Sequence, residues 1–102
     1  MNNRNIPNWL EIEIIKRDNN CVYCGVVFDK NDFKNKATWE HIINDENIIN
    51  ISNIALCCAS CNSSKGSKEL SEWLKSNYCK KKNITSKSVS DVIKKSLGIK
   101  DI

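Results

Sequence analysis

Cys21-Val22-Tyr23-Cys24 and Cys58-Ala59-Ser60-Cys61 are two cysteine pairs of identical spacing, and they decide the fold. Each pair brings two sulfur atoms onto one turn, and 33 residues, 25–57, separate the pairs. Two such pairs complete the tetrahedral four-sulfur shell of a structural Zn²⁺. Because this site closes a long loop, it can supply a large part of the folding free energy of a short chain. The alternatives are two disulfides or cysteines that are simply buried.

The remaining cysteines and the start of the chain bear on this choice. Only Cys58 has the two-residue gap to Cys61, so we expect its neighbour Cys57 to pack in the core and Cys79 to be a free thiol. Residues 1–7 lack the apolar run of a secretory signal, and no stretch of about 18 apolar residues is present. We therefore expect an intracellular protein, cytoplasmic or nucleoid-associated, whose reduced thiols bind metal.

Charge is unevenly spread along the 102 residues, a length that suits one domain. The net charge is +4, with a balance of −2 over residues 1–61 and +6 over residues 62–102. The basic half indicates a polyanionic partner, although charge alone is equally typical of a solvated lysine-rich surface. Four zinc-bound thiolates would lower the total to about +2. Any affinity for a polyanion must then come from a local patch.

The pattern of apolar residues indicates an α+β domain. Helical periodicity predicts three helices, over residues 8–18, 62–77 and 91–97. Short β-prone runs predict strands over 26–28, 38–43 and 54–57. In the second helix Leu70, Trp73 and Leu74 share one face, and a basic connector is expected over residues 79–87. Ser90 and Gly98 are suited to begin and end the last helix.

Residues with catalytic chemistry stand between and after the cysteine pairs. They are Glu40-His41, then Asn53, then Cys61-Asn62-Ser63-Ser64-Lys65-Gly66. This order resembles the His-Asn-His (HNH) endonuclease family over roughly residues 9–75. The resemblance implies a zinc-stapled ββα-metal (His-Me finger) domain with flanking N- and C-terminal helices. We expect residues 1–102 to form a single HNH endonuclease domain, with a core at about 9–75 and a basic C-terminal extension over 78–102.

The resemblance also implies a role for each of these residues. His41 would be the general base, and Glu40 and Asn62 would supply oxygens to a catalytic Mg²⁺ or Mn²⁺. Asn53 would hold the loop that orients the histidine. Glu40 stands where the family usually has Asp, and Asn62 stands where it often has His. Neighbours on a strand face opposite sides, so Glu40 and His41 need a bulge between them to serve one site.

The ordinary interpretations of the same residues are structural. A single histidine on a strand is usually a satisfied structural residue, and an asparagine at the start of a helix, such as Asn62, is equally a helix cap. The ordered set of residues, rather than any one of them, favours catalysis.

The function implied by the resemblance is that of a metal-dependent DNA endonuclease. It would hydrolyse phosphodiester bonds to leave 5′-phosphate and 3′-hydroxyl ends. Candidate DNA contacts are Lys65, Lys68, Lys80, Lys81 and Lys82. One site per chain means that a double-strand cut takes a homodimer or two successive nicks. The alternatives are a non-catalytic zinc-ribbon nucleic-acid-binding module, or an interaction domain with an exposed apolar patch; Trp39 and Trp73 fit the core better.

Overall fold

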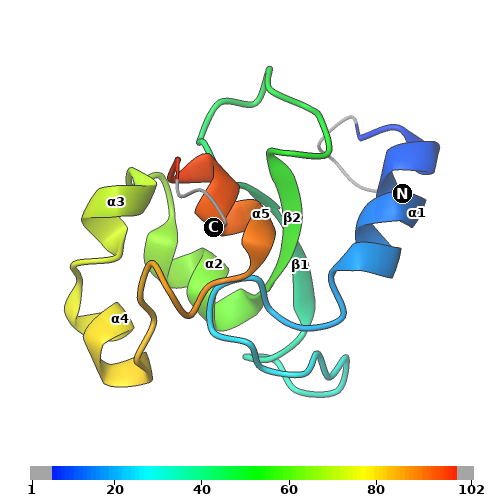
Figure 1. Cartoon of the computed structure of the whole chain (residues 1–102). Coiled ribbons are helices and arrows are strands. Elements are labelled where there is room, and N and C mark those ends of the chain that lie inside the picture. The colour runs from blue at the N-terminus through cyan, green and yellow to red at the C-terminus, as the bar shows by residue number, and fades with distance from the viewer. Residues whose placement is uncertain (1–5, 99–102) are drawn as a thin grey trace.

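The computed structural model describes residues 6–98 of the chain. In chain order its elements are α1 (Asn8–Arg17), β1 (Ala37–His41), β2 (Ile54–Cys58), α2 (Ala59–Lys65), α3 (Leu70–Trp73), α4 (Asn77–Lys82) and α5 (Asp91–Ser96). The strands lie at the centre, with α1 on one side and α2, α3 and α4 on the other (Figure 1). No helix within residues 6–98 is long and apolar enough to cross a bilayer.

A two-stranded hairpin leads directly into a helix. β1 and β2 pair antiparallel, with a register that runs from Ala37 opposite Cys58 to His41 opposite Ile54. β2 ends at Cys58, whose Sγ atom accepts a hydrogen bond from the backbone N–H of Cys61 and so caps the start of α2. The predicted ββα arrangement is confirmed, and the second cysteine pair lies at the junction of strand and helix.

The hairpin separates two hydrophobic clusters. The smaller joins Leu10 and Ile14 of α1 to Ile54 and Leu56 of β2, with Trp39 of β1 packed against it. The larger covers the opposite side and contains the zinc-binding cysteines and Trp73. Residues of β2 serve both clusters, and every residue of this strand is buried. Trp39 and Trp73 thus belong to the core, as the sequence predicts.

Several predicted elements differ from those observed. The helix predicted over 62–77 is two helices, α2 and α3, because Gly66 adopts a positive φ of 52°, which ends the first. The basic connector predicted over 79–87 begins with a helix, α4, which Ser76 caps through its side chain. Residues 26–28 form no strand but only an isolated bridge between Asn20 and Val27.

Both flanking helices lie close to their predicted bounds. α1 begins at Asn8 as expected and ends one residue early, at Arg17. α5 begins at Asp91 with Ser90 in the capping position, and Gly98 follows it with a φ of 80°.

Candidate active site and metal centre

The two cysteine pairs converge on one point. The Sγ atoms of Cys21, Cys24, Cys58 and Cys61 all lie within 4.8 Å of one another, and Cys24 and Cys58 are 3.7 Å apart. A tetrahedral zinc ion with Zn–S bonds of about 2.3 Å separates its sulfur ligands by about 3.8 Å. The four cysteines are therefore placed to hold a metal ion, and the donor set fits structural zinc.

Hydrogen bonds orient the four sulfur atoms. In each pair the backbone N–H of the second cysteine donates a hydrogen bond to the Sγ atom of the first. The two bonds run from Cys24 to Cys21 and from Cys61 to Cys58, both at 3.4 Å. The hydroxyl of Tyr78, on α4, donates to the Sγ atom of Cys61 at 3.2 Å. Such donors stabilise thiolates and fix their direction toward a metal.

The close packing of the thiols shifts their pKa values in opposite directions. For Cys21 the interaction with Cys24 acts to raise the pKa, but hydrogen bonds from Cys58 and Cys61 outweigh it and lower the pKa to about 6. A hydrogen bond from Cys21 lowers the pKa of Cys24 as well. The interactions with Cys21 and Cys24 raise the pKa values of Cys58 and Cys61. Without a metal ion the cluster therefore favours the thiolate form at the first cysteine pair and the thiol form at the second.

The other two cysteines stay apart from this cluster. Cys57 is fully buried beside Thr38, and burial raises the pKa of its thiol well above the usual value. Cys79 is also fully buried and is a free thiol. The assignment of Cys58 rather than Cys57 to the metal cluster is confirmed.

His41 lies at the end of β1, where the hairpin opens into the loop of residues 42–53. Only 6% of its surface is exposed, and its Nε2 atom is buried. His41 also takes part in a further interaction within the fold. Alternation along the strand places it on the same side of the sheet as Trp39 and opposite to Glu40.

Asn53 fastens the backbone that follows His41. Its Oδ1 atom accepts a hydrogen bond from the N–H of Ile43 at 2.7 Å, and its Nδ2 atom donates to the carbonyl groups of Ile43 and Ile48 at 3.2 and 3.1 Å. The carbonyl of Asn53 also accepts from the N–H of Ile42 at 2.9 Å. These bonds are the ones that a residue holding the loop after the histidine would need.

The side chain of Glu40 does not lie beside that of His41. Its carboxylate is buried, accepts a hydrogen bond from the hydroxyl of Tyr23 at 2.7 Å, and pairs with the ammonium of Lys65 at 3.0 Å. The register of β1 and β2 continues through Glu40 and His41 without an extra residue. The bulge that a shared site requires is therefore absent, and this carboxylate does not fit as a ligand of a catalytic divalent ion.

Asn62 docks the first turns of α2 onto β1. Its Nδ2 atom donates to the Oγ1 atom of Thr38 at 2.9 Å and to the carbonyl of Trp39 at 3.1 Å. Neither Glu40 nor His41 is a partner in these bonds. Among residues 6–98, the only group of three or more His, Cys, Asp or Glu side chains placed for a metal is the four-cysteine cluster.

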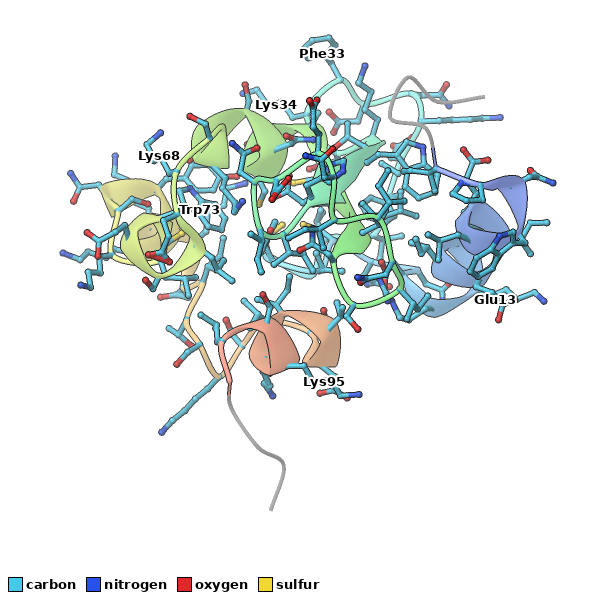
Figure 2. All side chains as sticks on the ribbon, turned by 90° about the horizontal axis from the view of Figure 1, so that it is seen from above. Glu13, Phe33, Lys34, Lys68, Trp73 and Lys95 are labelled. Atoms are coloured by element: carbon cyan, nitrogen blue, oxygen red, sulfur yellow. The ribbon has the colours of Figure 1, made fainter. Side chains whose placement is uncertain are left out.

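The candidate DNA contacts divide into two kinds. Lys65 has no exposed surface, so a phosphate contact does not fit its place in the fold. Lys68 is exposed at the rim of the molecule that also carries Lys34 and Phe33 (Figure 2). The lysines of α4, residues 80–82, are exposed as well. The sequence gives no signal for the roles of Tyr23, which lies within a cysteine pair, and Tyr78, which lies between the predicted second helix and the predicted connector.

A hairpin, a following helix and a four-cysteine metal cluster together define a small zinc-stapled ββα domain. Residues 21–68 match the family model described as HNH endonuclease. Over this segment the chain is similar to HNH endonucleases, a similarity that implies a nucleic-acid substrate. Comparisons with curated proteins and with solved structures gave no match.

Proposed function

We propose that this protein is a DNA endonuclease in which His41 is the general base. The observation that carries the proposal is the fastening of the backbone on the carboxyl side of His41 by Asn53, within a segment that matches the HNH endonuclease model. A general base must be held in a fixed direction, because small displacements of a catalytic group cost large factors in rate.

The reaction follows from the chemistry of a phosphodiester. A nitrogen of His41 takes a proton from water, the water oxygen attacks phosphorus, and the bond to the 3′ oxygen breaks. The 3′ oxygen takes a proton from solvent as it leaves. The products carry a 5′-phosphate and a 3′-hydroxyl. Because His41 is only 6% exposed and its Nε2 atom is buried, the residues around it must move for the imidazole to meet water and the substrate.

One observation favours a second function, a non-catalytic zinc module that binds nucleic acid. The carboxylate expected at the catalytic ion is instead used inside the fold by Tyr23 and Lys65. A binding module needs the zinc cluster and the exposed lysines but not an available carboxylate. It would bind DNA with a salt-dependent affinity and leave the backbone intact.

Nicking of supercoiled plasmid, with Mg²⁺, Mn²⁺ or EDTA, separates the two functions. We expect the wild-type protein to nick and His41→Ala to lose about 10²–10⁴-fold in rate, as is usual when a general base is removed. Glu46→Ala, a change of an exposed residue in the following loop, is the matched control and should keep the wild-type rate. Zinc content and thermal midpoint are measured for each variant. Equal rates for wild type and His41→Ala would end the catalytic proposal.

A further inference from the structure

Three side chains from distant parts of the chain form a polar cluster in the interior. Tyr23 comes from the first cysteine pair, Glu40 from β1 and Lys65 from the last turn of α2, and their exposed fractions are 1%, 4% and 0%. The Lys65 ammonium lies 3.0 Å from the Glu40 carboxylate, and the Tyr23 hydroxyl donates to the same carboxylate oxygen at 2.7 Å. Buried charges are tolerated when they are paired and hydrogen-bonded, as these are.

Tyr23 supplies the second donor of this cluster. Its phenol O–H donates to the carboxylate oxygen that also pairs with Lys65. The carboxylate thus receives donors from two sides, and all three side chains are at most 4% exposed.

Lys65 also holds the backbone next to the histidine. Besides the pair with Glu40, its Nζ atom donates to the carbonyl of Ile42 at 3.1 Å. Glu40 and Ile42 are the two neighbours of His41 in the chain, so one ammonium binds the residue before it and the residue after it. Asn53 binds the same stretch of backbone from the other strand, through the N–H groups of Ile42 and Ile43.

A divalent cation has no place on this carboxylate while Lys65 is present. The ion would bring two more positive charges within a few ångströms of a fully buried ammonium, and like charges at that distance repel strongly. Displacement of Lys65 from the carboxylate would in turn leave the charge of Lys65 buried without a partner, which strongly destabilises a fold. Metal ligation and the observed ion pair therefore exclude each other.

We infer that Glu40 and Lys65 are positioning residues for His41, and that neither a metal ion nor a DNA phosphate is their partner. This inference rests on the proposed function of His41, and it departs from the roles that the sequence predicts for both residues. The ion pair acts on the backbone that carries the imidazole, so its loss should change the orientation of His41 rather than the binding of metal or DNA.

A double-mutant cycle tests this inference with Glu40→Gln, Lys65→Met and the combined variant. Each single change leaves one buried charge without its partner, so the thermal midpoint and kcat should fall, with kcat about 10²-fold lower and KM for DNA unchanged. The combined variant removes both charges and should regain much of the midpoint and part of kcat. The Mg²⁺ concentration at half-maximal rate should stay within about twofold of wild type in Glu40→Gln. The exposed pair Glu72–Lys75, at 3.3 Å, offers the matched control, and Glu72→Gln with Lys75→Met should change nothing.

A second readout does not depend on activity. His41 is the one histidine among the 102 residues, so its ring signals in an NMR spectrum need no assignment. They should shift or split in both single variants and return toward wild type in the combined variant. Ring signals that are unchanged in both single variants would overturn the inference, as would a tenfold higher Mg²⁺ requirement in Glu40→Gln. Absence of nicking by the wild type would instead count against the proposed function and would leave the NMR outcome to decide the positioning role.

Discussion

At the scale of single residues, Asn53 links the two strands where the hairpin opens. Its side chain satisfies both the N–H and the carbonyl of Ile43 and reaches the carbonyl of Ile48. An asparagine suits this place because its amide offers an acceptor and two donors within one plane. Aspartate offers no donor, and alanine offers neither. The side-chain amide of Asn53 therefore fixes the backbone path of the loop that follows His41 as well as its attachment to the start of β2.

Asn53→Ala should lower the free energy of unfolding by about 1–3 kcal/mol, because it leaves backbone groups of Ile43 and Ile48 without partners. The nicking rate should fall by about tenfold or more at saturating DNA, since His41 loses one of its two supports. Chemical denaturation and plasmid nicking measure the two effects. Asn47→Ala, an exposed change in the same loop, serves as control. A variant Asn53→Ala with wild-type stability and rate would show that the loop holds its path without this amide.

The sequence points to the residues of the candidate site, but it does not predict which side chains pair with one another. Glu40, His41, Asn53 and Asn62 stand in an order that indicates the family, and order alone says nothing about which face of a strand each occupies. Strict alternation in β1 sends the Glu40 side chain to the side of α2, where Lys65 completes the pair. Burial of a lysine is rare enough that no pattern predicts it without a visible partner.

At the scale of elements, the sequence predicted those that follow a strong local rule. The hairpin strands and α1 come from clear apolar patterns, and the cysteine spacing marks the junction of β2 and α2. The break between α2 and α3 depends on one backbone conformation at Gly66, which periodicity does not detect. α4 was missed because its sequence is polar and basic, with only Cys79 buried, so it has no apolar stripe to recognise.

The helix α4 joins the exposed lysines to the zinc cluster. Lys80, Lys81 and Lys82 occupy its last turn, while Tyr78 near its start donates to the Sγ atom of Cys61 in the four-cysteine cluster. The Lys82 ammonium also lies 5.0 Å from the centre of the Tyr78 ring, a cation–π contact. A helix fixed in this way presents its charges in a defined place, which a free connector would not.

Replacement of all three α4 lysines by alanine should weaken DNA binding and reduce its salt dependence. Each lost phosphate contact should lower the slope of log K against log salt by about 0.9. Binding isotherms at several salt concentrations give the slope. The control is a triple change of equal charge on exposed or half-exposed positions of the C-terminal segment, at Lys87, Lys94 and Lys95. Equal slopes for the two triple variants would show that α4 is no special DNA surface.

At the scale of the whole molecule, the larger hydrophobic cluster is built around the metal site. Cys58 and Cys61 have no exposed surface, and both belong to the cluster that also contains Trp73. A chain of this length buries little apolar surface, so a zinc ion in this site would contribute a large share of its stability. Zinc binding and folding would then form one coupled equilibrium.

The Cys58→Ser variant should lose zinc and cooperative unfolding. The same substitution at the neighbouring Cys57 is the matched comparison. Cys57→Ser should keep one zinc per chain and lose about 1–3 kcal/mol, because a buried hydroxyl replaces a buried thiol. Elemental analysis and thermal unfolding distinguish the two. Addition of a strong chelator to the wild type should reproduce the Cys58→Ser behaviour. Retention of zinc by Cys58→Ser, or its loss from Cys57→Ser, would contradict the ligand assignment.

The positions of the four cysteines also give the chain the topology of a ring. A metal ion on the four cysteines would join residues 21–24 to residues 58–61 and close the segment 25–57, which holds His41 and Asn53, into a ring, while α1, α3, α4 and α5 lie outside it. A closed ring of this kind stays connected after one cut in its backbone. A single protease cut in its exposed loop near Asp45 would leave two fragments bound to the same ion, joined by coordination bonds instead of peptide bonds.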